Sequence, residues 1–279
     1  MPPHAIVRFA NRVANTCSNP CCFSFCPMQS YAINLNNINC KGKKMVIFAI
    51  KLHIYKKETM KISTRAEIMP SSPIRKLSGI AQKIESEGVH VYHLNIGQPD
   101  LPTPEIGLEA AKNIDRKVLE YSPSQGFLSL RKKLCDYYEQ YQIKFSPDDI
   151  IITCGGSEAV LFAFMTCLNP GDEIIVPEPA YANYMAFAVS AGAVIKPIVS
   201  TIEDGFALPP VEKFEELITE KTKGILICNP NNPTGYLYTR KEMLQLRDLV
   251  KKYDLFLFSD EVYREFIYTG SPYISACHL

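Results

Sequence analysis

The chain has 279 residues, of which 47% are apolar, enough for a substantial hydrophobic core. Residues 1–57 contain eight basic and no acidic residues, whereas the remainder is mildly acidic with scattered basic residues, a distribution that gives no sign of nucleic-acid binding. No apolar run approaches the roughly 18 residues of a membrane span, so the sequence predicts no transmembrane helix.

The first 59 residues differ in composition from the rest of the chain. They contain five of the ten cysteines, namely Cys17, Cys21, Cys22, Cys26 and Cys40. A zinc site in "CSNPCCFSFC" lacks a downstream His or Cys pair at finger spacing. A cleaved targeting segment would suit the basic charge but has no clear amphipathic period here. We interpret residues 1–59 as an atypical Cys-rich extension, disordered or an artefact of the gene model, with the natural start at Met60.

Residues 60–147 are predicted to form an extended arm followed by helices and one short strand. The first helix begins near Ser72-Pro73, where proline suits the first turn, and ends near Gly88. The elements expected in this part are helices over 72–88, over 104–118 and at the end of 121–142, with a short strand within 91–100.

After Pro147 the pattern alternates between apolar strands and helices. The strands are expected at 149–153, 173–177, 193–199, 224–228 and 255–260, and the helices at 157–168, 181–191, 210–219 and 240–253. Thr239 and Glu242 form a capping box at the start of the last helix. Continuous apolar strands separated by helices predict an α/β fold whose mostly parallel sheet is covered by helices on both faces.

In such sheets ligands bind at the carboxyl ends of the strands, so the residues that follow each strand are the most informative. These residues are "CGGSEA", "PEPAYANY", "CNPNNPTG" and "SDEVYREF". Each has an ordinary structural explanation when taken alone: a packing turn, core or rim aromatics, a strand-ending turn, and Asp260 capping the next segment. Together they offer an anion site, an aromatic face, amide and phenol groups, and a buried carboxylate. That combination suits a phosphorylated heteroaromatic cation such as pyridoxal phosphate (PLP).

At this point the chain resembles the class I/II aminotransferases, which are fold-type-I PLP-dependent enzymes. The resemblance covers roughly residues 65–279 and rests on six motifs in the family's order, "NIGQPDLPTP", "YSPSQGFLSLR", "GGSEA", "PEPAYANY", "NPNNPTG" and "SDEVY". Each motif alone is a weak indication of the family, but six motifs in the family's order are a strong one. The resemblance implies a PLP-binding large domain over 111–279, preceded at 60–110 by an arm and part of a small domain.

The resemblance also implies which residues contact the cofactor ring. Asp260 would pair with the pyridinium nitrogen and keep it protonated, which makes the ring an electron sink. Asn232 and Tyr263 would hydrogen-bond the 3-oxygen of the ring. Asn232 would also be a substrate-binding residue. Tyr181 would stack on the ring. In this interpretation the prolines of "NPNNPTG" fix a rigid loop that directs Asn232 at the cofactor.

The remaining roles concern the phosphate and the substrate carboxylate. Gly156, Ser157 and Glu158 would bind the phosphate with the backbone N–H groups at the start of their helix. Gly97 would present its N–H group to the α-carboxylate of the substrate. Tyr121 would reach the phosphate of the neighbouring subunit, which implies a homodimer with shared active sites. No metal ligands are assigned.

The family's Schiff-base lysine lies beyond "SDEVY", whereas the last lysine here is Lys252, so no catalytic residue is assigned. The resemblance therefore describes the N-terminal portion of an aminotransferase, truncated at Leu279. It places two absent strands between those at 149–153 and 224–228. We expect the chain as given to fold poorly and to be inactive.

Two alternatives stay open. The chain is a non-catalytic short isoform that binds PLP or a full-length subunit, or it uses the same scaffold as a lyase, a decarboxylase or an enzyme similar to aminocyclopropane-carboxylate synthase. The family leads us to expect a cytoplasmic enzyme that acts on an L-amino acid and a 2-oxo acid. Aspartate, aromatic or broad specificity with 2-oxoglutarate is a family-level expectation only.

Overall fold

The computed structural model describes residues 61–279. The expectations for the extension 1–59, for its cysteines and for Met60 lie outside the described residues. Among the described residues, no helix is both long and apolar enough to cross a membrane.

A parallel sheet of four strands forms the centre of the α/β part. Its strands are β1 (Glu173–Glu178), β2 (Val194–Val199), β3 (Thr222–Cys228) and β4 (Phe256–Asp260). They are arranged in the order β2-β1-β3-β4, and every neighbouring pair is parallel. The register places Cys228 opposite Asp260, so β3 and β4 end at the same level. This confirms four of the predicted strands and the predicted fold class.

The apolar residues of β3 alternate between the two faces of the sheet, as the period of two in a strand requires. Leu226 and Cys228 belong to a core cluster with residues of α6 and α7, whereas Ile225 and Ile227 belong to a second cluster with residues of α8 and α9. Both sets are at most 4% exposed. A strand buried on both faces explains why its sequence is continuously apolar instead of alternating.

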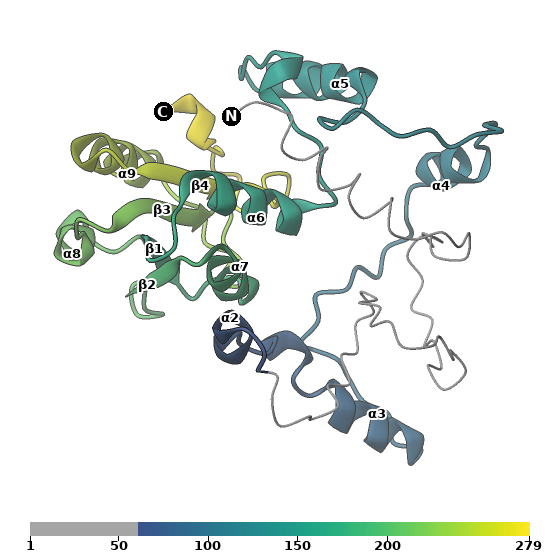
Figure 1. The fold of residues 1–279 in the computed structure, drawn as a ribbon, viewed down its shortest axis with the longest axis horizontal. Coiled ribbons are helices and arrows are strands. Elements are labelled where there is room, and N and C mark those ends of the chain that lie inside the picture. Colours follow the sequence, from purple (N-terminus) through teal and green to yellow (C-terminus); the bar gives the residue numbers. More distant parts are fainter. Residues whose placement is uncertain (1–60) are drawn as a thin grey trace. The chain divides into compact units, whose positions relative to one another are not determined.

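Two pairs of helices cover the sheet, and Figure 1 shows the strands between them. The helices are α6 (Gly156–Cys167) and α7 (Asn183–Ala191) on one face, and α8 (Val211–Leu217) and α9 (Arg240–Tyr253) on the other. The capping box predicted for α9 is present, with Thr239 and Glu242 each accepting a hydrogen bond from the other's backbone N–H group.

The part before the sheet is helical and differs from the prediction in three places. It contains α2 (Thr64–Ile68), η2 (Pro73–Arg75), α3 (Ser78–Ser86), α4 (Glu105–Lys112), α5 (Leu128–Glu139) and η3 (Pro147–Asp149), while η4 (Ala276–His278) lies at the other end. The helix expected over 72–88 is divided into η2 and α3, and the helix over 104–118 ends at Lys112, where Asn113 leaves helical geometry. No strand forms at 91–100, because this segment has no strand partner there and leaves Tyr92 and Leu94 exposed.

The strand expected at 149–153 is also absent from the described residues. Asp149 ends η3, and Ile152 donates its N–H to the carbonyl oxygen of Gln125 at 3.0 Å instead of joining the sheet. Gly126, at φ +89°, lets the chain approach Ile152 so closely that a Cβ would lie 2.4 Å from its side chain. The expectation of two further strands between 149–153 and 224–228 stays a prediction, and such strands would lie beyond β4, which pairs directly with β3.

Candidate active site

A cavity of about 190 Å³ lies where the chain leaves β3 and β4. Its lining comes from the start of α6, from the residues that lead into α7 and from the turns after β3 and β4. The lining residues are Gly156, Ser157, Val160, Tyr181, Tyr184, Phe187, Cys228, Asn232, Asp260, Val262 and Tyr263. The carboxyl ends of two neighbouring parallel strands therefore form a cavity, as the topology of an open α/β sheet favours.

Asp260, the last residue of β4, places a half-buried carboxylate at this cavity. Its Oδ2 accepts a hydrogen bond of 2.7 Å from the hydroxyl of Tyr184, and its Oδ1 accepts one of 3.2 Å from the N–H of Val262. Burial raises the pKa of Tyr184 strongly, and nearby Cys228 and Asp260 raise it further. The phenol therefore keeps its proton at all ordinary pH values and remains a donor to the carboxylate.

Asn232 and Tyr263 are hydrogen-bonded to each other at the same cavity. The Nδ2 group of Asn232 donates to the hydroxyl oxygen of Tyr263 at 3.2 Å. The pKa of Tyr263 is raised, mainly by burial and then by the neighbouring Cys228. The pair presents an amide and a protonated phenol, two groups that can donate hydrogen bonds to an oxygen of a ligand.

The loop that carries Asn232 is held by the other two asparagines of "NPNNPTG". Asn229 is fully buried, and its side chain accepts from the N–H of Tyr238 at 3.1 Å and donates to the carbonyl of Ile274 at 3.1 Å. Asn231 accepts from the N–H of Thr234 at 3.3 Å. The asparagines at 229 and 231 thus have structural roles that the sequence interpretation, which credited the prolines, did not identify.

Tyr181 lies at the cavity with its ring edge-to-face against Tyr184, at a centroid distance of 5.4 Å. Its hydroxyl oxygen accepts a hydrogen bond of 2.7 Å from Nδ2 of Asn183. The aromatic wall is therefore fixed both by ring contact and by a hydrogen bond.

The first residues of α6 form another side of the cavity. Gly155 precedes the helix at φ +81°, a conformation that favours glycine. Because glycine has no side chain, it makes no capping hydrogen bond to the helix. The N–H groups of the first helical turn have no acceptor within the helix and carry the positive end of its dipole. Glu158 points elsewhere, because its carboxylate accepts the N–H of Cys154 at 2.6 Å.

The structure thus brings six of the nine candidate residues to one cavity. They are Gly156, Ser157, Tyr181, Asn232, Asp260 and Tyr263. Glu158, Tyr121 and Gly97 are not among the lining residues, and Tyr121 and Gly97 are exposed.

Sequence reasoning gave no site role to Tyr184 or Cys228. Tyr184 follows Tyr181 by three residues, a spacing that brings two side chains to one side of a helical turn and could have identified it. Burial, together with the carboxylate of Asp260, raises the pKa of the Cys228 thiol to about 11, so this group is neutral at ordinary pH.

An adjoining cavity of about 360 Å³ shares Gly156, Val160 and Asp260 with the first.

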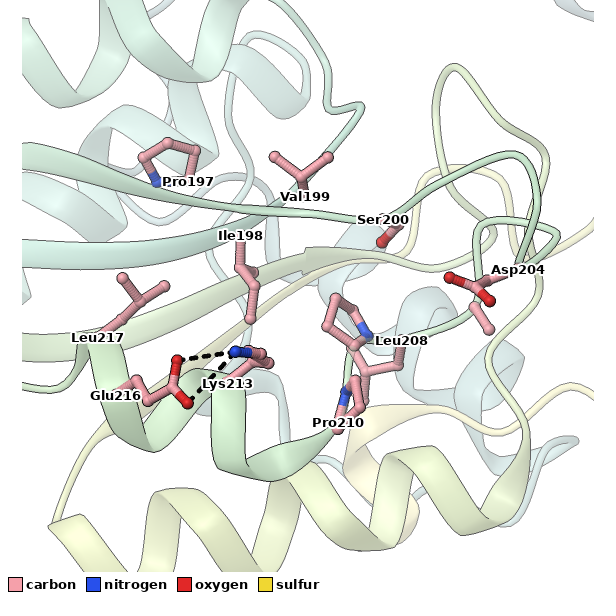
Figure 2. A pocket seen from close by; sticks show the side chains of 12 residues that line it. Pro197, Ile198, Val199, Ser200, Asp204, Leu208, Pro210, Lys213, Glu216 and Leu217 are labelled. Carbon is pink, nitrogen blue, oxygen red and sulfur yellow. Dashed lines mark hydrogen bonds and ion pairs between the residues drawn. The ribbon is translucent and has the colours of Figure 1, made fainter.

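Larger hollows occur away from these residues. One of about 640 Å³ lies between β2 and α8, where Figure 2 shows the exposed Lys213–Glu216 ion pair beside Ile198 and Leu217. Another of about 940 Å³ borders Arg264 and His278. Neither is lined by any of the nine candidate site residues, so size alone does not identify the site.

Comparison with known proteins identifies a family for the chain. The family model "Aminotransferase class I and II" matches residues 89–279. Aspartate aminotransferase of Thermotoga maritima is 35% identical over 210 residues, covering 75% of this chain and 55% of that protein. Aromatic-amino-acid aminotransferase 2 of Thermococcus litoralis is 36% identical over 215 residues, covering 76% and 54%.

Solved structures give the same result. The crystal structure of Thermotoga maritima aspartate aminotransferase superposes with a TM-score of 0.73 at 34% identity, covering 77% of this chain and 58% of that one. Alanine aminotransferase from Pyrococcus furiosus gives a TM-score of 0.72 at 32% identity, covering 77% and 56%. The chain spans about half the length of the curated relatives it matches. By sequence and fold, the chain belongs to the class I and II aminotransferases.

Proposed function

We propose that the cavity at the ends of β3 and β4 binds PLP and that the chain contributes this site to an aminotransferase. The observation that carries the proposal is the position of Asp260. Its carboxylate lies at the cavity, is oriented by Tyr184, and stands beside the Asn232–Tyr263 pair. The family uses PLP, and these are the residue types that a protonated pyridine ring with a phenolic oxygen requires.

The residues present fit the cofactor. Asp260 would hold the proton of the ring nitrogen, and Asn232 with Tyr263 would hydrogen-bond the 3-oxygen. Tyr181 would cover the ring face. The N–H groups of Gly156 and Ser157 would bind the phosphate at the positive end of α6. The cavity of about 190 Å³ is small for a ligand site, and the adjoining 360 Å³ cavity shares residues with it, so the two together offer enough space.

When bound, PLP supplies an electron sink that stabilises negative charge at the α-carbon of an amino acid. Asp260 would face the ring nitrogen, and Tyr184 holds its carboxylate in one orientation through the 2.7 Å hydrogen bond. Tyr263 and Asn232 restrain one another at 3.2 Å and would thereby hold the ring oxygen in place. The asparagine-rich loop keeps Asn232 at the cavity through the buried side chain of Asn229.

We propose an L-amino acid and a 2-oxo acid as the substrates, as expected for the family, with Gly97 binding the substrate carboxylate. We also propose a homodimer in which Tyr121 reaches the neighbouring site, and its full exposure is compatible with that role. A cytoplasmic location is supported by the free cysteines among the described residues.

The cavity has no lysine among its lining residues in the described part of the chain. We therefore propose that the 279-residue chain binds PLP without a covalent bond and does not turn over substrate. When the chain is incubated with an amino acid and a 2-oxo acid, it should form no more product than a heat-treated sample of the same chain. Clear transamination by the purified chain would contradict this part of the proposal.

Equilibrium titration with PLP, followed by absorbance, tests the binding site. The unmodified chain should bind PLP saturably, and Asp260→Asn should weaken binding by at least about tenfold because the ring nitrogen loses its ionic partner. Asp136→Asn on α5, which changes an exposed carboxylate outside the cavity, is the matched control and should leave the dissociation constant unchanged. Equal binding by the Asp260 and Asp136 variants would refute the assignment.

A further inference from the structure

Tyr263 belongs to a turn whose next residue is anchored on the side away from the cavity. Residues 262–265 form the turn after β4, and Tyr263 is 36% exposed at the cavity. The adjacent Arg264 is only 8% exposed. Neighbouring residues of one short turn therefore have opposite surroundings, one in the candidate cofactor site and one in the protein interior.

Arg264 lies among four tyrosine rings. The centre of its guanidinium group is 5.5 Å from the ring centroid of Tyr137, 5.2 Å from Tyr138, 4.4 Å from Tyr141 and 5.4 Å from Tyr273. The first two are on α5, and Tyr141 follows the end of that helix. A desolvated cation attracted by several ring faces is held more firmly than one at the surface. We call these four residues the tyrosine cage.

The tyrosine cage also fixes the residue after Arg264. The carboxylate of Glu265 accepts hydrogen bonds from the hydroxyls of Tyr137 and Tyr141, the latter at 3.2 Å, and lies 3.7 Å from Nε of Arg264. The two terminal nitrogens of Arg264 have no hydrogen-bond partner among the described residues and are buried. The ring faces and Glu265 are therefore its observed partners, and the 940 Å³ cavity beside it does not open onto these nitrogens.

Backbone hydrogen bonds connect this anchored part of the turn to Tyr263. The N–H of Phe266 donates to the carbonyl of Tyr263 at 2.8 Å, and the N–H of Arg264 donates to the carbonyl of Glu261 at 3.1 Å. Glu261 is itself held by the hydroxyl of Ser275 at 2.9 Å. A shift of Arg264 must therefore move the backbone that carries the Tyr263 ring.

We propose that Arg264 is a positioning residue, which acts through the tyrosine cage to hold the Tyr263 hydroxyl at Asn232 and hence at the cofactor's 3-oxygen. The inference rests on the proposed PLP site. Arg264 touches neither cofactor nor substrate. Its effect on binding must pass through Tyr263, and this dependence separates positioning from a general contribution to stability.

A double-mutant cycle with PLP affinity as the readout tests this dependence. Arg264→Met should weaken PLP binding about fivefold in the unmodified background and by less than about twofold in a Tyr263→Phe background, because coupled residues are not additive. Arg247→Met on α9, whose side chain pairs with Asp248, is the control and should change neither value. An equal loss in both backgrounds, or no loss in the first, would overturn the proposal.

A second readout needs no cofactor. In chain labelled with ¹³C at the ζ-carbon of tyrosine, the Tyr263 resonance, assigned by its loss in Tyr263→Phe, should shift or broaden in Arg264→Met and stay unchanged in Arg247→Met. Arg264→Lys, which keeps the cation, should return the Tyr263 resonance part of the way to its position in the unmodified chain. An unmoved Tyr263 resonance refutes the positioning role, whereas failure of the unmodified chain to bind PLP refutes the proposed function and leaves the hold of Arg264 on Tyr263 to be judged by the resonance.

If Arg264→Met does not fold, Tyr141→Leu replaces it in both measurements. This change removes the nearest ring of the cage at a residue that is 37% exposed, where a fold-breaking cavity is not expected. The same coupling to Tyr263 and the same change in its resonance are expected. Additive loss in the cycle, with no change in the resonance, would count against the proposal as before.

Discussion

The carboxylate of Asp260 is the residue-level feature on which the site depends. It accepts hydrogen bonds from the Tyr184 hydroxyl and from the N–H of Val262, and among the described residues it has no cationic partner at hydrogen-bond distance. A carboxylate placed this way remains available to a cationic ligand.

Replacing Tyr184 with Phe should show how much the fold gains from this hydrogen bond. Because the bond ends on a carboxylate, its loss should lower the free energy of unfolding by about 1.5–3 kcal/mol. Tyr181→Phe removes a hydroxyl that contacts only the amide of Asn183 among the described residues, and should cost about 1 kcal/mol or less. Urea unfolding of the two variants gives the comparison, and equal costs would show that the Asp260 contact is not special.

Residue identity predicted the site only in part. Asp260 could be selected because a carboxylate at the end of a buried strand is costly without a partner, whereas the choice of Asn232 and Tyr263 rests on the resemblance to the family. Asn229 could not be separated from Asn232 in the same way. Two asparagines in one loop have the same chemistry, and only the fold shows that one is fully buried and bonded to distant backbone.

At the scale of single elements, α9 shows the strongest agreement between sequence and structure. Its predicted range and its capping box are both present. Glu242 does more than close the capping box, since it also accepts the N–H of Leu208 at 2.8 Å and the hydroxyl of Tyr236 at 3.0 Å. The cap therefore fixes the helix and also connects it to the preceding loop.

This double role predicts an order of stability losses. Thr239→Ala should lower the free energy of unfolding by about 1 kcal/mol through loss of the cap, and Thr239→Ser should restore most of it. Glu242→Ala should cost about twice as much, because it leaves further polar groups without partners. Chemical unfolding of the three variants measures the order. Equal losses for Thr239→Ala and Glu242→Ala would show that the contacts to Leu208 and Tyr236 contribute nothing.

The strands at 91–100 and 149–153 illustrate what a local pattern cannot predict. Their apolar residues fit a strand, but a strand also needs a neighbour with which to exchange backbone hydrogen bonds. Ile152 bonds to Gln125 instead, and Leu94 stays exposed. The helix boundaries near Lys112 and within 72–88 were missed because they depend on local backbone turns that periodicity does not register.

For the whole molecule, the fold class could be predicted because the order of apolar strands and helices is a global property of the sequence. The order of strands in the sheet could not be predicted in this way, because β1 and β3 are neighbours in the sheet although β2 lies between them in the chain. The resemblance placed two absent strands between 149–153 and 224–228, and because β4 pairs directly with β3, such strands would lie beyond β4.

Buried tyrosines predict how the stability of the whole molecule depends on pH. Burial raises the pKa of Tyr184, Tyr238 and Tyr273 above the ordinary value of 10.0. Below pH 10 these phenols are protonated in both the folded and the unfolded state, so their contribution is constant. Above pH 10 the unfolded chain loses the protons while the folded chain keeps them, so stability must fall as pH rises.

Urea midpoints measured between pH 8 and pH 11.5 check this sign. We expect a plateau to about pH 10 and a decline above it. Tyr238→Phe should make the decline shallower, whereas Tyr268→Phe, at a residue that is 88% exposed, should not. A midpoint that is constant or rises through this range would contradict the burial of these phenols.

The most direct test of the proposed PLP site is the protonation state of the ring nitrogen of PLP bound to the chain. Nitrogen-15 NMR of the chain loaded with ¹⁵N-labelled PLP distinguishes a protonated from a neutral pyridine. We expect a protonated nitrogen at pH 8 in the unmodified chain and in Asp136→Asn, and a neutral one in Asp260→Asn. A neutral nitrogen in the unmodified chain, or no bound signal at all, would contradict the assignment of the cavity to PLP.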